Sequence, residues 1–156
     1  MTDEQGCLAC DLASGRAPLP GGAILHTEGW AVEHCIGPLG VGTLIMKPLR
    51  HVIRFADLSP EESAEFGPLL QRIAAAVLAE TGADQTYICQ WSHAGWRPGH
   101  IHFVVQAAWN SQGNRYARPG PFLQAALFDE AVPLDRAAVA QFCERMRARL
   151  AQGVRA

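Results

Sequence analysis

Short apolar runs separated by turn residues fill the first third of the chain. Two of them, Ala23–His26 and Trp30–Cys35, are joined by only three residues, a spacing that predicts a β-hairpin. A third run of β-forming residues, Thr43–Met46, ends at a Lys-Pro pair. Residues 1–20 show no such pattern and predict an irregular N-terminal arm, which ends in a cluster of proline and glycine.

The clearest helical pattern follows Ser59. Ser59 offers an N-cap hydroxyl, Pro60 suits the first helical position, and Glu62 stands at the capping-box position. Apolar residues then recur every three or four positions, and Gly82 is a typical C-terminal stop. Pro68 lies inside this pattern and predicts a kink or a later start, because it cannot donate to the carbonyl four residues earlier.

The second half of the chain predicts two more strands, Gln85–Trp91 and His100–Gln106, and then a polar loop over residues 107–120. A last helix is predicted at about Asp135–Leu150, with Asp135 as its cap. Mostly antiparallel strands, one long helix and a C-terminal helix predict a single α+β domain over residues 1–156.

Composition narrows the class of protein. Hydrophobic residues make up 49% of the chain and charged residues 18%, which excludes a disordered protein. The 13 basic and 15 acidic residues give no general attraction to nucleic acid or to an anionic membrane. No apolar run approaches the ~20 residues of a membrane span, and the polar N-terminus does not resemble a signal peptide. We therefore expect a cytoplasmic protein, and a phosphate ligand would need a local site to attract it.

The most informative stretch contains His100 and His102. On a strand these two residues and Val104 share one face, and imidazoles can serve as nucleophile, acid, base or metal ligand. The alternative to a functional site is that both are surface or edge histidines without a special role. The preceding loop carries Gly95 and Arg97, which suit the close approach of an anion, although a plain turn also explains its glycines.

Five cysteines are an odd number and do not predict a disulfide framework. Three of them lie singly in apolar segments and predict small buried thiols. Cys7 and Cys10 differ, because their spacing is C-x-x-C.

The order of these motifs resembles the histidine triad (HIT) family of nucleotide hydrolases and transferases. The resemblance covers roughly residues 5–106 and rests on motifs in sequence order: Cys7-x-x-Cys10, Thr43–His51, Asp57–Glu62 before the long helix, and Gly95 five residues before His100-Ile101-His102. It implies an antiparallel sheet of about five strands and a homodimer in which two protomers join their sheets. Residues 107–156 carry no family motif and form a C-terminal extension.

The resemblance also implies a mechanism and a metal. His102, the middle histidine of the motif, attacks the α-phosphorus of a nucleotide, and His100 orients the strand or binds metal. Diadenosine polyphosphates and nucleoside phosphoramidates are the implied substrates. Some members with the early C-x-x-C hold a structural zinc, which implies the ligands Cys7, Cys10, His51 and His100 here; two thiolates and two imidazoles suit tetrahedral zinc.

Two positions depart from the family pattern. The third triad position is Val104, which can neither donate nor accept a hydrogen bond, and candidates to replace its contact are Gln90, Ser92 and His93. The family often has an acidic residue on the second strand that holds the ribose hydroxyls. Cys35 stands there, and a thiol is a poor partner for two hydroxyls.

Two alternatives to an enzyme with a histidine nucleophile remain open. The chain can be a nucleotide or phosphate binder that has lost turnover through Val104 and Cys35. It can also be a zinc hydrolase in which His100 and His102 hold the metal. No Asp or Glu lies within Gln85–Gln106, so the zinc hydrolase lacks a nearby general base.

Overall fold

The structure is a computed structural model and describes residues 4–92, 99–117 and 119–152. The elements follow one another as α1 (Leu8–Ala13), β1 (Ala23–His26), β2 (Trp30–His34), β3 (Leu44–Pro48), the 3-10 helix η1 (Phe55–Asp57), α2 (Pro60–Thr81), β4 (Gln85–Trp91), β5 (His102–Ala108), α3 (Asn110–Tyr116), α4 (Pro121–Asp129) and α5 (Arg136–Gln152). The predicted α+β class is confirmed. No helix in the described ranges has the length and apolar character needed to cross a membrane.

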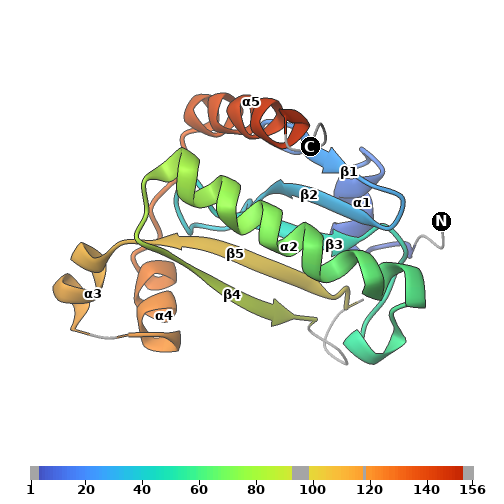
Figure 1. The fold of residues 1–156 in the computed structure, drawn as a ribbon, viewed down its shortest axis with the longest axis horizontal. Coiled ribbons are helices and arrows are strands. Elements are labelled where there is room, and N and C mark those ends of the chain that lie inside the picture. The colour runs from blue at the N-terminus through green and yellow to red at the C-terminus, as the bar shows by residue number, and fades with distance from the viewer. Residues whose placement is uncertain (1–3, 93–98, 118, 153–156) are drawn as a thin grey trace.

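All five strands form one antiparallel sheet in the order β1-β2-β3-β5-β4 (Figure 1). β5 lies between β3 and β4, so it pairs with a neighbouring strand on both sides. Ile45 on β3 stands opposite Val104 on β5, and Val104 stands opposite Cys89 on β4. Residues paired in this way share a face of the sheet, so the register determines which side chains meet.

One face of the sheet carries the hydrophobic core. α2 runs across this face, and α5 packs beside it over β1 and β2 (Figure 1). Trp30, Met46, Phe103 and Ile73 are among the buried side chains between these layers. The alternation of strand residues sends these side chains toward the helices and sends Glu33, Lys47 and His102 toward the other face.

The long helix α2 begins as the sequence predicts. The Ser59 hydroxyl accepts from the backbone N–H of Glu62, the Glu62 carboxylate accepts from the N–H of Ser59, and Gly82 ends the helix in the left-handed conformation. The helix starts at Pro60 and continues through Pro68 to Thr81, so the expected later start is wrong. One missing backbone donor is tolerated because the helix packs on the sheet and on α5.

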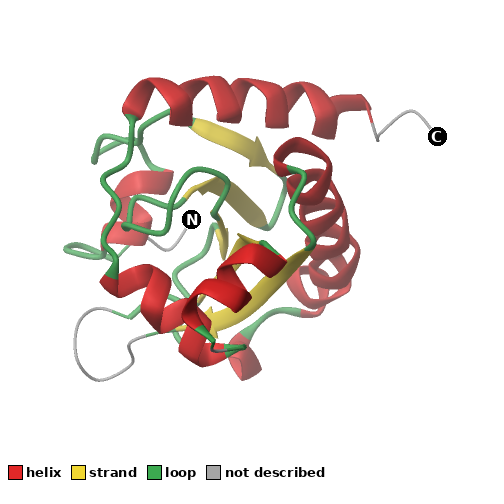
Figure 2. Ribbon diagram, turned by 90° about the vertical axis from the view of Figure 1, so that its left-hand side faces the viewer, coloured by secondary structure: helices red, strands yellow, loops and turns green. Residues whose placement is uncertain are grey.

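α1 and α4 lie on the other face of the sheet, and helices flank the strands on both sides in Figure 2. The Gln124 side chain of α4 accepts from the Cys89 thiol and donates to the Gln106 side chain, with heavy-atom distances of 2.9 Å and 3.2 Å. α1 covers the same face near β2 and β3, where its residues line a cavity. The sheet therefore has a core face and a second face that carries α1, the cavity and α4.

Three sequence predictions differ from the structure. The N-terminal arm contains α1, whose six residues are too few to show a helical period. The predicted loop over 107–120 contains α3, a polar helix without an apolar face. Hydrogen bonds support its start: the Trp109 N–H donates to the Gln112 side chain, and the Asn110 N–H donates to the distant Asp84 carboxylate. β5 begins at His102 rather than His100, because the Ile101 N–H donates to the carbonyl of Val52 outside the sheet.

The predicted N-terminal cap of the C-terminal helix α5 is confirmed. The Asp135 carboxylate accepts from the backbone N–H groups of Ala137 and Ala138. Arg147 on this helix donates to the carbonyls of Gly21 and Ala23 at 2.9 Å each. These two bonds hold the segment before β1 against α5.

Candidate functional site

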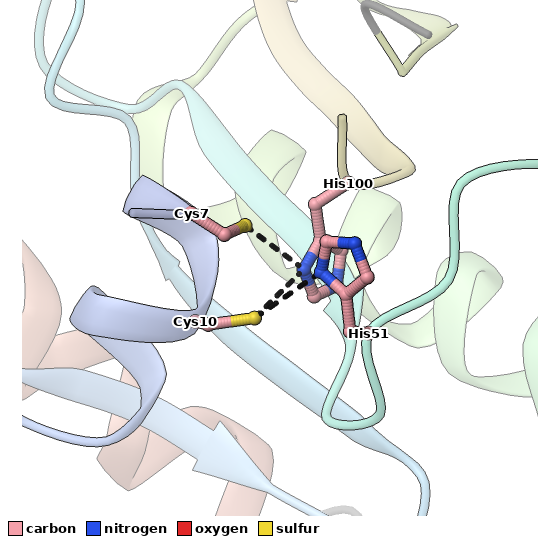
Figure 3. Close-up of side chains that lie close together, drawn as sticks. All are labelled: Cys7, Cys10, His51 and His100. Carbon is pink, nitrogen blue, oxygen red and sulfur yellow. Dashed lines mark hydrogen bonds between the residues drawn. The ribbon is translucent and has the colours of Figure 1, made fainter. Parts of the chain in front are cut away.

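Four side chains from three distant segments meet beside the second face of the sheet (Figure 3). Cys7 precedes α1 and Cys10 lies in its first turn, so one turn of helix brings both thiols to the same side. His51 follows β3, and His100 directly precedes Ile101 and β5. The sulfur and ring-nitrogen atoms of the four residues lie within 4.8 Å of one another.

The distances in this cluster fit a tetrahedral ion. Cys10 Sγ lies 3.4 Å from His51 Nδ1 and 3.5 Å from His100 Nδ1, and Cys7 Sγ lies 3.6 Å from His100 Nδ1. Zinc–sulfur bonds of about 2.3 Å and zinc–nitrogen bonds of about 2.0–2.1 Å at tetrahedral angles place sulfur and nitrogen about 3.5 Å apart. By its donor set and its geometry, the cluster is a zinc site.

His100 is held in the form that a metal needs. Its Nε2–H donates to the carbonyl of Pro48 at 3.0 Å, which leaves the lone pair of Nδ1 facing the two thiols. Burial lowers the pKa of His100 to about 4, against the opposing effect of the Pro48 hydrogen bond, so the ring is neutral near pH 7. Cys7, Cys10 and His100 are buried and His51 is partly buried, which excludes water from most of the cluster.

A cavity of about 360 Å³ adjoins the cluster. Its wall on the sheet side comes from β2, β3 and β5, and its opposite wall comes from the N-terminal segment and α1. The lining residues are Gly6, Cys7, Leu8, Ala9, Leu12, Glu33, Cys35, Ile36, Ile45, Lys47, Ser92, His100 and His102. The cavity thus contains both histidines of the sequence motif.

His102 opens β5 and is partly exposed in this cavity. Its Nδ1 lies 2.9 Å from the carbonyl oxygen of His100, and because a carbonyl only accepts, Nδ1 carries the proton. In the neutral ring the lone pair is then on Nε2, which is the nucleophilic nitrogen. The indole of Trp91 stands edge-on to the ring, with centroids 6.1 Å apart.

The side chains of the two motif histidines therefore lie in different surroundings. The sequence predicts that His100 and His102 project together from one strand, but His100 precedes β5 and its ring lies in the metal cluster. Its backbone carbonyl, rather than its ring, contacts His102. This arrangement gives no support to a zinc shared by His100 and His102 as a catalytic ion.

The structure brings together only some of the other predicted ligand-binding residues. Ser92 lines the cavity. Gln90 stands opposite Phe103 in the ladder and so projects from the core face, away from His102. His93, Gly95 and Arg97 lie outside the described residues.

Val104 shares the face of His102 but is buried between its ladder partners Ile45 and Cys89. The position contributes packing rather than a polar contact. Cys35 lines the cavity as expected for its strand, and burial raises the pKa of its thiol, so it is neutral near pH 7.

Sequence reasoning missed a buried ion pair in the cavity wall. Lys47 Nζ lies 2.6 Å from the Glu33 carboxylate, and the side chains are only 1% and 4% exposed. Burial raises the pKa of Glu33, while the Lys47 ammonium acts in the opposite direction. The alternation of residues along β2 could have indicated the position of Glu33, because Glu33 lies two residues before Cys35 and shares its face.

Comparisons with known proteins show what this chain is similar to. No sequence model of a protein family matches the chain. An uncharacterized HIT-like protein of Mycobacterium tuberculosis, present in two strains, is 33% identical over 82 residues, which are 53% of this chain and 56% of the relative. A crystal structure of a zinc-bound histidine triad family protein from Mycobacterium smegmatis has a TM-score of 0.66 and 26% identity, and the alignment covers 95% of each chain. The chain is similar in sequence and fold to histidine triad proteins.

These similarities confirm the resemblance seen in the sequence motifs. The match to the curated relatives spans only about half of their length. A HIT-like protein involved in cell-cycle regulation from Bartonella henselae has a TM-score of 0.69 at 14% identity, over 96% of this chain and 99% of that one, which shows the fold alone. The zinc-bound histidine triad neighbour and the cluster of Cys7, Cys10, His51 and His100 agree with the predicted cofactor.

The ion pair in the cavity wall leads to a stability prediction. In Lys47→Met the carboxylate of Glu33 stays buried without its ammonium, so we expect the free energy of unfolding at pH 7 to fall by about 3–5 kcal/mol in urea denaturation. The loss of Lys47 raises the pKa of Glu33 further in the folded state. The folded protein then binds more protons than the unfolded chain, so its stability falls as the pH rises from the usual pKa of glutamate.

The double variant Glu33→Gln/Lys47→Met is the matched control. It removes both charges, and most of the stability lost in Lys47→Met should return. Equal stability of Lys47→Met and wild type across this pH range would show that the pair is not a buried ion pair in solution.

Proposed function

We propose that the protein is a nucleotide phosphohydrolase or nucleotidyl transferase that uses His102 as its nucleophile. The observation that carries the proposal is the partly exposed His102 ring in the cavity, with Nδ1–H bound to the His100 carbonyl. This bond fixes the tautomer and leaves Nε2 as the nucleophilic nitrogen. The similarity to histidine triad proteins supports the same chemistry but assigns no substrate.

The proposed reaction has two displacement steps. His102 Nε2 attacks the α-phosphorus of a dinucleoside polyphosphate or a nucleoside phosphoramidate, a P–N bond forms, and the bond to the leaving group breaks. Positive charge develops on the ring, and the carbonyl of His100 stabilises it through the Nδ1–H bond. Water or another acceptor then attacks the phosphorus, releases the nucleotide and returns His102 to its neutral form.

Two residues of the cavity suit contacts to the substrate. Ser92 brings a hydroxyl to the cavity beside His102, and Glu33 brings a carboxylate that can accept from sugar hydroxyls. We assign this second role to Glu33 rather than Cys35, because a neutral thiol is the weaker acceptor. The expected contributions of His93, Gly95 and Arg97 stay predictions.

Zinc in the four-residue cluster is proposed to be structural. Four protein ligands complete a tetrahedral shell and leave no open position for a substrate or a reactive water. The side chains of the chain itself therefore perform the chemistry, with the metal holding α1, His51 and His100 together.

We further propose a homodimer formed through β4. This strand pairs with β5 along one side and lies at the end of the sheet order, which leaves its other edge available. Ile88 and Trp91 on β4 are exposed large hydrophobic side chains. Pairing of two β4 edges would extend the sheet across both protomers and cover this edge.

A nucleotide-binding protein without turnover is the second candidate, and Val104 is the observation that favours it. Its buried isopropyl group offers no hydrogen bond to a phosphate or a leaving group. Loss of one such contact in a transition state costs about 2.7–4 kcal/mol. The fold and the cavity would remain under this alternative while turnover would be slow or absent.

Product analysis of His102→Ala tests the proposed mechanism. With a panel of dinucleoside polyphosphates and adenosine phosphoramidates, wild type should release a nucleoside monophosphate. His102→Ala should lose this release by at least about a thousandfold, because the variant has no nucleophile. The matched control is His26→Ala, since His26 is exposed on β1 at the far end of the sheet.

Mass spectrometry of protein that has been quenched without acid adds an independent readout of the covalent intermediate. A nucleotidyl adduct on the peptide that contains His102 supports the covalent step. Equal product release by wild type and His102→Ala would contradict the nucleophile assignment. Binding of a nucleotide with no release by wild type would establish the second candidate.

Metal analysis tests the zinc assignment. Purified wild type should contain one zinc per chain by inductively coupled plasma mass spectrometry, because the four ligands form one site. Cys10→Ser should lose most of this zinc and melt at a lower temperature. Cys89→Ser should keep both properties, since Cys89 lies on β4 outside the cluster. Full zinc content in Cys10→Ser would contradict the site.

A further inference from the structure

We propose that the metal cluster positions one wall of the nucleotide cavity, so that zinc binding and nucleotide binding strengthen each other. The inference rests on the proposed function for the identity of the ligand. It goes beyond a structural zinc, because it makes the metal a determinant of affinity in the neighbouring cavity.

α1 supplies an apolar wall to the cavity. Leu8, Ala9 and Leu12 line it from the helix side, and Ile36 and Ile45 line it from the sheet side. An apolar, planar part of a ligand fits between two such walls while its phosphate reaches His102. The Leu8 side chain is 56% exposed, so it is available for contact with a ligand that enters.

The position of this wall depends on the cluster. The backbone hydrogen bonds of Cys7, Asp11, Ser14 and Ala17 close within the N-terminal segment itself. The thiol contacts of Cys7 and Cys10 with His51 and His100 reach across to the rest of the chain. A helix of six residues is not stable alone, so its placement depends on contacts with the rest of the chain, which are these thiol contacts and the packing of buried Leu12.

The same cluster also reaches the nucleophile. The ring of His100 is a metal ligand by position, and its backbone carbonyl accepts from His102 Nδ1–H. One residue thus joins the metal, the α1 wall and the orientation of the His102 ring. A ligand that contacts both the wall and His102 prefers the state in which the cluster is assembled.

Thermodynamic linkage makes this coupling reciprocal. If zinc raises the affinity for a nucleotide by a given factor, the nucleotide raises the affinity for zinc by the same factor. Coupling between sites is typically 5–150-fold, and we expect about tenfold here. The reciprocal effect can be measured on the zinc-loaded protein, without isolating a metal-free form.

The experiment follows transfer of zinc from the protein to a chromogenic chelator, with and without saturating AMP. In wild type, AMP should raise the chelator concentration needed for half-transfer by about tenfold. Leu8→Ala shortens the α1 wall and should reduce this shift to less than about threefold while zinc still binds. Val41→Ala is the matched control, an exposed aliphatic residue outside the cavity, and should keep the full shift.

Two further readouts separate the possible failures. Calorimetric titration with AMP shows whether the zinc-loaded protein binds a nucleotide at all. Hydrogen exchange of the α1 amides before and after chelation tests the wall without any nucleotide; α1 should lose protection while α2 stays protected. Absence of AMP binding together with metal-dependent protection of α1 would contradict the proposed function but support the positioning of the wall.

Two results would overturn the inference. The first is AMP binding that leaves zinc transfer unchanged in wild type. The second is full protection of the α1 amides after zinc removal, which would show that the helix holds its place without the metal.

Discussion

The contacts of Cys7 and Cys10 with His51 and His100 join three segments that lie far apart in the sequence (Figure 3). They fix α1 on the second face of the sheet, and they fix the chain just before β5. His100 then presents its carbonyl to His102, which determines the tautomer of the proposed nucleophile. In the proposed mechanism, the α1 wall of the cavity and the orientation of the His102 ring both depend on this one cluster.

The antiparallel register supplies the rest of the site. Because β5 lies between β3 and β4, side chains from three strands meet on one face around His102. The same register buries Val104, sends Gln90 to the core face and places the Lys47–Glu33 ion pair in the cavity wall. A buried pair of opposite charges is costly to separate, so it holds β2 and β3 in a fixed relation below the cavity.

Local signals in the sequence predicted much of this fold. The capping box at Ser59, the stop at Gly82 and the C-x-x-C spacing are short-range features, and the structure contains α2 and the predicted ligand cluster. The position of His100, the side of Gln90 and the partner of Lys47 depend on pairing between distant strands. Six residues of α1 and the polar helix α3 lack the period that sequence reasoning requires.

X-ray absorption at the zinc edge of the purified protein tests the central claim most directly, because it reports the atoms bound to the metal. The account predicts two sulfur ligands at about 2.3 Å and two nitrogen ligands at about 2.0–2.1 Å, with no water in the shell. A shell of nitrogen and oxygen alone would contradict it, because Cys7 and Cys10 would then leave α1 unattached to the metal.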